Sequence, residues 1–419
     1  MTTKFPGRLT PALSASSAAA AIRQVLSLAP FALFLVILPF PGTVAARLLF
    51  LFICFGSALW QWRRLPAARA PIPCKAALGA WMAVCLASLA YAFDAAYTLG
   101  ELKNEVGYSM MAYFAFFVVG HDRGNALWLL RASGLGSLAI GSWALFALVG
   151  NDFHWNEGGG HGGIGVFATY VITVVPALAW LSCEDSSPLL RRIAAGLSVF
   201  AMFLAAITMQ RAVWPVLALQ LVLALAMATR AGLIKVRRRL LLIAVGLVAA
   251  AALAGLVAIQ QIRYGDARNE QVQLNTDVRI AFWPRVIARI VEHPLTGTGF
   301  GRGVIHKAYP DLTPEATPAL WHAHNVLLNY GLEMGFPGIV VLASLFAAFG
   351  ILFWRASAGP SALAGIAGFV IVASVLARNQ FNDFFMRDMS LMFWALAGLF
   401  ARLTVAARQG NSNDQQRPA

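Results

Sequence analysis

The sequence predicts an all-helical protein that crosses a membrane about twelve times. Three observations lead to this fold class: 59% of the 419 residues are hydrophobic, only 12% are charged, and the mean hydropathy is +0.69. Soluble domains carry about a quarter charged residues and less than half apolar residues, which excludes an ordinary soluble fold. Apolar runs of about 20 residues, the length that crosses a bilayer core, recur along nearly the whole chain.

Apolar stretches bounded by charged residues mark the expected spans. The first begins near Val25 behind a basic N-terminus, and since no small-residue cleavage pattern follows it, we expect a retained span and not a removed signal peptide. The approximate limits are 25–40, 44–62, 76–93, 106–120, 132–150, 164–183, 193–209, 212–229, 240–259, 335–354, 361–377 and 389–403. A long polar segment, about 260–320, separates the ninth span from the tenth.

The distribution of charge predicts the orientation of the spans. With the N-terminus in the cytoplasm, 20 of the 32 Lys and Arg residues are cytoplasmic, seven lie in the long segment and five lie in short outer loops. The long segment then faces outward, which in a bacterium is the periplasmic side of the inner membrane. We expect a cytoplasmic N-terminus at 1–24, helices one to nine at 25–259, a periplasmic segment at 260–334, helices ten to twelve at 335–403 and a disordered cytoplasmic tail at 404–419.

Several classes of function are excluded or disfavoured by the sequence. The net charge of +14 does not indicate nucleic-acid binding, because the basic residues lie between apolar spans and not in one patch. The four cysteines have neither a disulfide framework nor metal-type spacing. No Walker pattern and no Asp-x-Asp pair occurs, so we expect neither a nucleotide motor nor a metal. Chemistry on the outer face, where ATP is absent, then requires a substrate that is already activated.

The first of three outward polar clusters is Thr208-Met-Gln-Arg211, between the seventh and eighth spans. Arg211 stands on a tight turn, opposes the positive-inside bias and has no adjacent acidic residue. A snorkelling interface arginine is the alternative, but polar groups at a membrane boundary favour a functional role.

The second cluster runs from Arg279 to Pro294 and is predicted to form an amphipathic helix. Arg285 and Arg289 flank its apolar face, as in a helix that lies at a membrane interface. Arg279 projects into that face if the helix runs unbroken through Pro284, whereas Pro284 otherwise begins the helix. The apolar face consists of Phe282, Trp283, Val286, Ile287 and Ile290. An arginine within this face needs an anionic partner, and a phosphate in the bilayer would serve, whereas a lipid-headgroup anchor fits Arg285 and Arg289 better.

A glycine-rich stretch, Gly297-Thr-Gly-Phe-Gly-Arg-Gly303, follows at once. It opens no βαβ unit, so it is not a dinucleotide fingerprint. Two interpretations stay open: a turn whose N–H groups bind an anion with help from Arg302, or simply a tight turn.

The third cluster is Trp321-His-Ala-His-Asn325, which leads into the tenth span. On a helix, His322 and His324 would point about 200° apart, whereas Asn325 as N-cap would leave both in the preceding turn. No third ligand at metal spacing is nearby. One histidine acting as a general base is the favoured interpretation, because its pKa lies near the working pH.

Two other polar stretches are less informative. His161, in a glycine-rich loop, is interpreted as incidental. Between Arg378 and Asp388, before the last span, we expect local ion pairs; the alternative is that Asp383 orients a catalytic group.

Taken in order, these clusters resemble the O-antigen ligase family of bacterial inner-membrane glycosyltransferases. The resemblance covers about residues 208–338. It rests on Thr208–Arg211, on Arg279 with Trp283, on His293-Pro-Leu-Thr-Gly297 with Gly299-Phe-Gly301, and on His324-Asn325 with Gly335, Pro337 and Gly338.

The resemblance implies a helical fold of the GT-C-like type and transfer of a glycan without ATP, metal or other cofactor. The donor would be an O-antigen carried on undecaprenyl diphosphate, and the acceptor a sugar hydroxyl of lipid A–core, with membrane lipids around both. Arg211 and Arg279 would hold the diphosphate, and His324 would take the proton of the acceptor hydroxyl. Further substrate contacts would come from Trp283, Arg285, Arg302, His322 and Asn325.

Two relatives of the ligases share this region: the O-antigen polymerases and the protein O-oligosaccharyltransferases. The short tail after the last span favours a ligase over the latter. A flippase or other transporter is the remoter alternative, because transporters place ionisable residues near the membrane midplane, whereas here they gather at one face.

Overall fold

The computed structural model describes residues 15–151, 155, 163–235, 246–248, 250, 253–254, 278–312 and 322–415; the side chains at 15–23, 278–281 and 407–415 lie outside the description. Within these ranges the secondary structure is helical, with no strand. The all-helical prediction is therefore confirmed for the described part of the chain.

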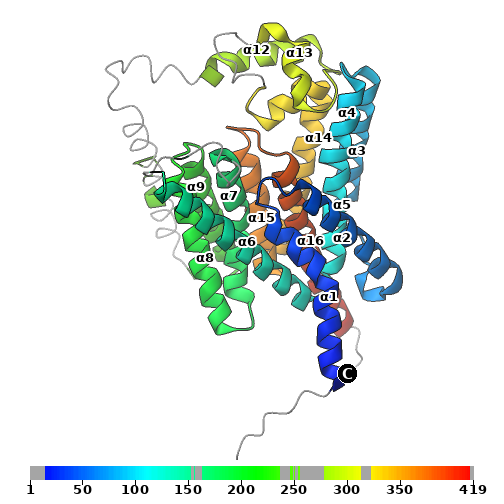
Figure 1. Ribbon diagram of the computed structural model, residues 1–419, viewed down its shortest axis with the longest axis vertical. Coiled ribbons are helices and arrows are strands. Elements are labelled where there is room, and N and C mark those ends of the chain that lie inside the picture. Colours follow the sequence, from blue (N-terminus) through cyan, green and yellow to red (C-terminus); the bar gives the residue numbers. More distant parts are fainter. Residues whose placement is uncertain are drawn as a thin grey trace, which may run out of the picture.

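The long helices pack side by side as a bundle (Figure 1). We call the end of the bundle at the top of Figure 1 the upper end; the start of α1 and the end of α16 lie at the lower end. The main helices are α1 (Ala15–Ile37), α2 (Val44–Arg64), α3 (Lys75–Ala87), α4 (Ala95–Glu101), α5 (Tyr108–Val119), α6 (Arg123–Val149), α7 (Ile164–Glu184), α8 (Pro188–Ile207), α9 (Val213–Arg230), α12 (Val278–Glu292), α13 (Ile305–Ala308), α14 (Val326–Ala356), α15 (Ala362–Arg378) and α16 (Arg387–Gln415).

The expected spans largely coincide with these helices. Among the described residues, seven helices are long and apolar enough to cross a membrane, and three shorter apolar stretches accompany them. The ninth expected span, 240–259, lies almost entirely outside the described residues, so the number twelve stays a prediction. The tenth differs from expectation: α14 begins at Val326, nine residues earlier than the predicted limit, because it continues across a sharp break at Gly335.

Helices α7 and α16 form the centre of the bundle. In their most apolar windows 89% and 83% of the positions are buried, against 28% for α2, α8 and α9. The peripheral helices instead expose large apolar side chains, such as Phe146 and Val199, as a surface in contact with lipid requires.

A buried glutamine braces the centre of the bundle. Pro176 lies inside α7 and has no N–H to donate to the carbonyl of Ile172, one turn earlier. The buried Gln220 of α9 donates its side-chain N–H to that carbonyl at 2.7 Å. The Ile172 carbonyl, which Pro176 leaves without a hydrogen-bond donor, thus receives one from a neighbouring helix.

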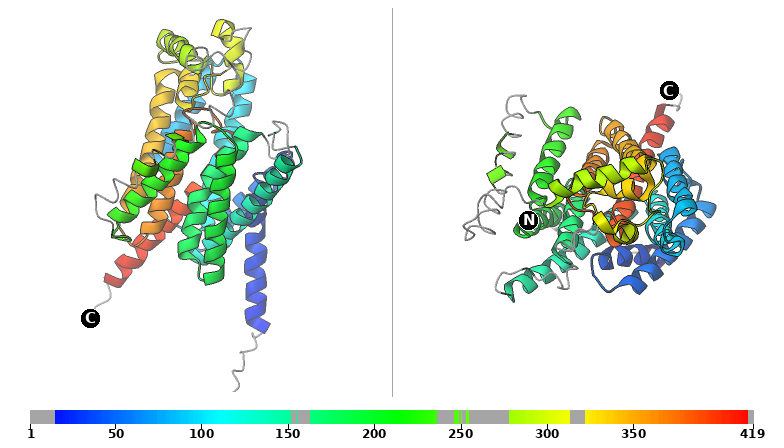
Figure 2. Two further views of the ribbon diagram at one scale, coloured as in Figure 1. Left: turned by 90° about the vertical axis from the view of Figure 1, so that its left-hand side faces the viewer. Right: turned by 90° about the horizontal axis from the view of Figure 1, so that it is seen from above.

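A separate layer formed by α12 and α13 covers the upper end (Figure 2). Phe282, Val286 and Ile290 of α12 are buried in a cluster with Ile305, Leu312, Ala323 and Leu332. The helix runs unbroken through Pro284. Its predicted amphipathic character is confirmed, but the apolar face is used differently from expectation, since it packs against the rest of the protein; only Ile287 of the predicted face is exposed.

The break in α14 and the glycine-rich loop form one junction. Gly335 has φ 65° and ψ −158°, and Pro337 has no N–H for the carbonyl of Glu333. That carbonyl accepts the N–H of Gly299 at 3.0 Å, and the neighbouring carbonyl of Leu332 accepts the N–H of Thr298 at 3.0 Å.

Close approach of the two segments at this junction requires glycine. The N–H of Phe336 donates to the carbonyl of Pro294 at 2.8 Å. A Cβ on Gly297 would collide with the Leu332 carbonyl oxygen, and one on Gly335 would lie 2.5 Å from that of Pro294. The two glycine-containing motifs of the sequence are therefore the two sides of a single backbone contact.

Candidate functional site

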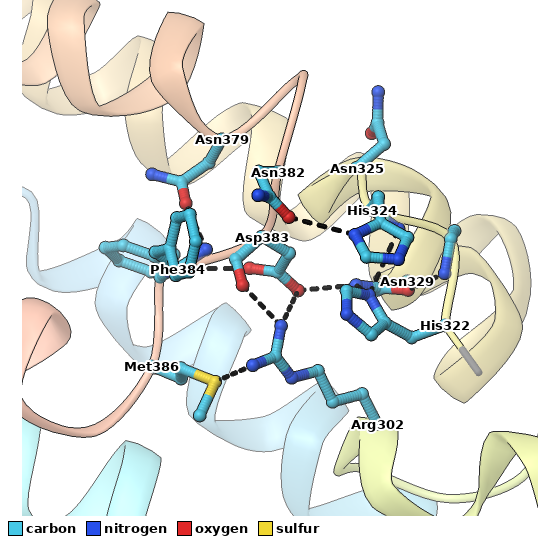
Figure 3. Close-up of polar contacts among 12 residues, drawn as sticks. Arg302, His322, His324, Asn325, Asn329, Asn379, Asn382, Asp383, Phe384 and Met386 are labelled. Atoms are coloured by element: carbon cyan, nitrogen blue, oxygen red, sulfur yellow. Dashed lines mark hydrogen bonds and ion pairs between the residues drawn. The ribbon is translucent and has the colours of Figure 1, made fainter. Parts of the chain in front are cut away.

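The predicted histidines lie at the upper end, where three segments meet (Figure 3). These are the loop 322–325, which we call the histidine loop; the connection 379–386 between α15 and α16, which we call the α15–α16 connection; and the short helix η4 (Arg302–Val304) at the end of the glycine-rich loop. The N–H of Val326 donates to the carbonyl of Asn379 at 2.9 Å, so the first two are joined through their backbones.

The histidine loop is tightly folded. His324 has φ 51°, a left-handed conformation that residues other than glycine seldom adopt. Its N–H donates to Nδ1 of His322 at 3.1 Å, and the centres of the two imidazole rings are 4.0 Å apart. Asn325 is the N-cap of α14, as predicted, since its Oδ1 accepts the N–H of Leu328 at 3.1 Å. Both histidines therefore precede the helix.

Side chains from distant parts of the chain hold this loop in place. Nδ1 of His324 lies 2.9 Å from Oδ1 of Asn382. The indole N–H of Trp283 donates to the carbonyl of Ala323 at 2.8 Å. This polar group of Trp283 thus positions the histidine loop; the predicted contact of Trp283 with substrate stays a prediction.

A buried polar network lies behind the two imidazoles. Asn329 accepts the N–H of Ala323 at 2.8 Å with Oδ1 and donates to Oδ2 of Asp383 at 2.5 Å. Asp383 also forms an ion pair with Arg302, with 3.5 Å between Nη1 and Oδ2. Arg302 donates further hydrogen bonds to the Asp383 carbonyl and to Sδ of Met386.

The prediction of local ion pairs between residues 378 and 388 is wrong, because the two acidic residues of this stretch pair with arginines elsewhere in the chain. Asp383 pairs with Arg302, and Asp388 pairs with Arg47 at the start of α2. Both partners are remote in sequence: the α15–α16 connection contacts the glycine-rich loop through Asp383, and the start of α16 contacts α2 through Asp388. Charge spacing along the chain could not reveal these pairs.

The glycine-rich loop uses its N–H groups within the protein. Beyond the bonds of Thr298 and Gly299 to α14, the N–H of Phe300 donates to Oγ of Ser88 at 3.0 Å, and that of Gly303 to the hydroxyl of Tyr97 at 2.9 Å. Of the two interpretations left open by the sequence, the structure supports the tight turn over the anion-binding loop.

The predicted arginines are placed as follows. Arg211 lies in the turn between α8 and α9, half-buried. Its neighbour Gln210 accepts a hydrogen bond from the buried Arg378 at the end of α15, where the α15–α16 connection begins. Arg211 and His324 are therefore at the same end of the bundle. Arg279 lies in α12, one turn before Trp283, but its side chain is outside the described residues.

The other two arginines of α12 are engaged with a neighbouring turn. Arg285 donates to the carbonyl of Asp311, and Arg289 pairs with both Glu292 and the carboxylate of Asp311. The hydrogen bond from Arg289 lowers the pKa of the Asp311 carboxyl. These contacts fasten α12 to the turn after α13.

A cavity of about 280 Å³ lies beside Arg302 and Asp383. Burial raises the pKa of the Tyr97 phenol at its wall to about 12, so this hydroxyl stays protonated. The cavity combines aromatic rings with carboxylates and guanidinium groups: Trp81, Tyr97, Phe300, Tyr330 and Phe385 with Glu101, Glu105, Glu333, Asp383, Arg302 and Arg387. Among the described residues, no group of three or more His, Cys, Asp or Glu side chains is arranged to hold a metal ion.

A family model described as O-antigen ligase matches residues 196–343. The resemblance to the O-antigen ligase family is confirmed for this region. No curated protein matches the chain. The O-antigen ligase region extends from α8 into α14, so it contains Arg211, α12, the glycine-rich loop and the histidine loop, whereas Asn382 and Asp383 lie beyond it. The match to this family model implies glycosyl transfer in general terms.

Sequence reasoning missed Asn329 and Asn382. Asn329 is a buried amide one turn after the N-cap Asn325, and such a residue in an apolar span is a recognisable signal. Asn382 has no comparable signal, because its contact with His324 joins residues 58 positions apart.

Proposed function

We propose that the protein is an O-antigen ligase of the bacterial inner membrane, with its upper end facing the periplasm. The donor is a glycan on undecaprenyl diphosphate and the acceptor is a sugar hydroxyl of lipid A–core. The observation that carries this proposal is the grouping of the Arg211 turn, α12 and the two adjacent imidazoles at one end of an apolar helical bundle.

The reaction requires no energy source beyond the donor. The acceptor oxygen forms a bond to the anomeric carbon while the bond from that carbon to the diphosphate oxygen breaks, and the electron pair leaves with the diphosphate. His324 takes the acceptor proton. Arg211 and Arg279 stabilise the negative charge that develops on the leaving group. Attack opposite the diphosphate inverts the anomeric centre.

The cavity beside Asp383 supports a saccharide substrate. Aromatic rings offer faces to the apolar side of a sugar ring, and the carboxylates around them accept hydrogen bonds from hydroxyl groups. Its size is at the lower limit of ligand pockets, about 300 Å³, which suits one sugar ring more than a chain of them.

A purified-component assay tests the proposal. Protein in detergent is mixed with undecaprenyl diphosphate-linked glycan and lipid A–core, with no nucleotide and with chelator present, and we expect lipopolysaccharide to form. His324→Ala should lose about 10²–10⁴-fold in rate, the usual contribution of a positioned base. The matched control is His121→Ala, at the lower end of the bundle, which should retain the wild-type rate.

The same assay separates the alternatives. A polymerase would join two carrier-linked glycans when lipid A–core is omitted, and a protein O-oligosaccharyltransferase would glycosylate a Ser-containing peptide. Wild-type activity in His324→Ala would refute the assignment of the base. Movement of glycan between leaflets without bond formation would favour a transporter.

A further inference from the structure

The two imidazoles of the histidine loop are held by different kinds of hydrogen-bond partner. A neutral imidazole carries one N–H and one lone pair, and the partner of one ring nitrogen decides which nitrogen keeps the proton. The contacts of His322 and His324 therefore determine what each ring can offer to a substrate.

At His324 the partner is an acceptor. Nδ1 lies 2.9 Å from Oδ1 of Asn382, and a carbonyl oxygen only accepts hydrogen bonds. Nδ1 must therefore carry the proton, and the lone pair is on Nε2. His324 is partly exposed, so a substrate can approach this ring.

At His322 the partners are donors. Its Nδ1 accepts the backbone N–H of His324 at 3.1 Å and lies 3.4 Å from Nδ2 of Asn329. The lone pair of His322 is therefore on Nδ1 and its proton is on Nε2. Only 4% of His322 is exposed, in contrast to His324.

We propose that Asn382 is a positioning residue that fixes His324 in the Nδ1–H form and so makes Nε2 the basic atom of the site, while His322 is fixed in the opposite Nε2–H form. This resolves the roles of the two histidines: His324 accepts the proton, and His322 supports the backbone of His324. The assignment of the two forms is independent of the reaction, whereas the role of Nε2 as base depends on the proposed function.

Asn382 carries no charge, which matters because His324 already has charged groups nearby. The described titratable or charged groups next to His324 are His322 on its own loop, Asp383 on the α15–α16 connection, and Arg302, which pairs with Asp383. An amide fixes the ring without adding charge, so it does not favour the imidazolium, the form that cannot act as a base.

The proton positions can be measured without activity. Full-length protein in nanodiscs is labelled with ¹⁵N at its seven histidines, and the couplings between ring nitrogens and ring protons distinguish the two neutral forms. Spectra of His322→Ala and His324→Ala assign the signals. We expect Nδ1–H for His324 and Nε2–H for His322; Nε2–H for His324 would overturn the proposal.

Activity then tests the role of Asn382. In Asn382→Asp the new carboxylate favours the protonated imidazole, so the acidic limb of the kcat profile should move to higher pH by about one unit or more. In Asn382→Leu the ring loses its acceptor, and kcat should fall by at least about 10-fold with little change in KM, within the contribution of a positioned base.

Gln380→Glu is the matched control. It places the same charge on the α15–α16 connection, but the Gln380 side chain donates to the Leu376 carbonyl at 3.1 Å and not to the imidazole. Its pH profile should equal that of the wild type. If Asn382→Asp shows the same unshifted profile as Gln380→Glu, Asn382 does not position the base. If the nitrogen signals are as expected but no glycan is transferred by the wild type, the proposed function fails and the assignment of the two forms stands.

Discussion

Replacement of Gly335 by alanine should destabilise the protein by about 2–4 kcal/mol. Its backbone angles of φ 65° and ψ −158° lie in a region essentially restricted to glycine, and a side chain there costs about 1–3 kcal/mol. The new Cβ would also lie 2.5 Å from the Pro294 carbonyl oxygen. Relief of that contact weakens the Phe336–Pro294 hydrogen bond, worth about 0.5–1.5 kcal/mol.

Buried thiols provide the assay. Cys54 and Cys85 are buried and free, so a thiol-reactive fluorescent dye reports their exposure on heating, while the exposed Cys183 sets the starting signal. Gly335→Ala should have a lower unfolding midpoint than the wild type. The control is Gly350→Ala in the same helix, where the nearest atom to the new Cβ is 3.8 Å away.

The control variant Gly350→Ala should change the stability in the opposite direction, towards a higher unfolding midpoint. Gly350 is an ordinary helical position, and alanine favours a helix over glycine by about 1 kcal/mol. Equal midpoints for Gly335→Ala and the wild type would refute the argument that the break in α14 depends on glycine. Equal destabilisation by both variants would show that the helix, and not the junction, is sensitive.

Two further predictions concern the bundle away from the site. Gln220→Leu leaves the Ile172 carbonyl without its donor and should lower stability by about 1–3 kcal/mol, measured by the same thiol assay; an unchanged midpoint would contradict the bracing role. The hydrogen bonds from Arg131 to Asp185, both at 2.8 Å, lower the pKa of the Asp185 carboxyl, so the folded state binds that proton less readily than the unfolded chain. The resulting stabilisation should be complete above the unfolded-state pKa of about 3.9 and be lost as the pH falls through the lower folded-state pKa. The midpoint difference between wild type and Asp185→Asn should therefore shrink below about pH 4, whereas a pH-independent difference would contradict the ion pair.

The helical elements could be predicted from the sequence because apolar runs, charges and caps are local signals. Eleven of the twelve expected spans coincide with described helices, and the cap at Asn325 is where the sequence placed it. The limit of 335 for the tenth span was nine residues too late, because the span limits followed the apolar run, whereas the predicted cap at Asn325 was already consistent with a start at Val326. The chain continues across Gly335, and Gly299 supplies the donor that Pro337 lacks.

The site could be predicted only in part. The histidine cluster and the Arg211 turn have strong signals, since polar residues are rare beside apolar spans. Asn382, the partner of His324, and Asp383, the partner of Asn329, come from a segment that the fold alone brings to the histidine loop. The same limit explains why Arg302, chosen for its place in a glycine-rich loop, pairs with a carboxylate 81 residues away.

The break at Gly335 has a consequence for how the protein tolerates different bilayers. The first two and a half turns of α14, which carry the histidine loop, are bonded to the glycine-rich loop and not aligned with the rest of that helix. A thicker or thinner hydrocarbon layer changes the tilt of apolar helices, and this tilt would be taken up by the part of α14 below the break. The imidazoles would then keep their distance from the rest of the upper end, so lipid composition could vary with growth conditions without disturbing the arrangement of these groups.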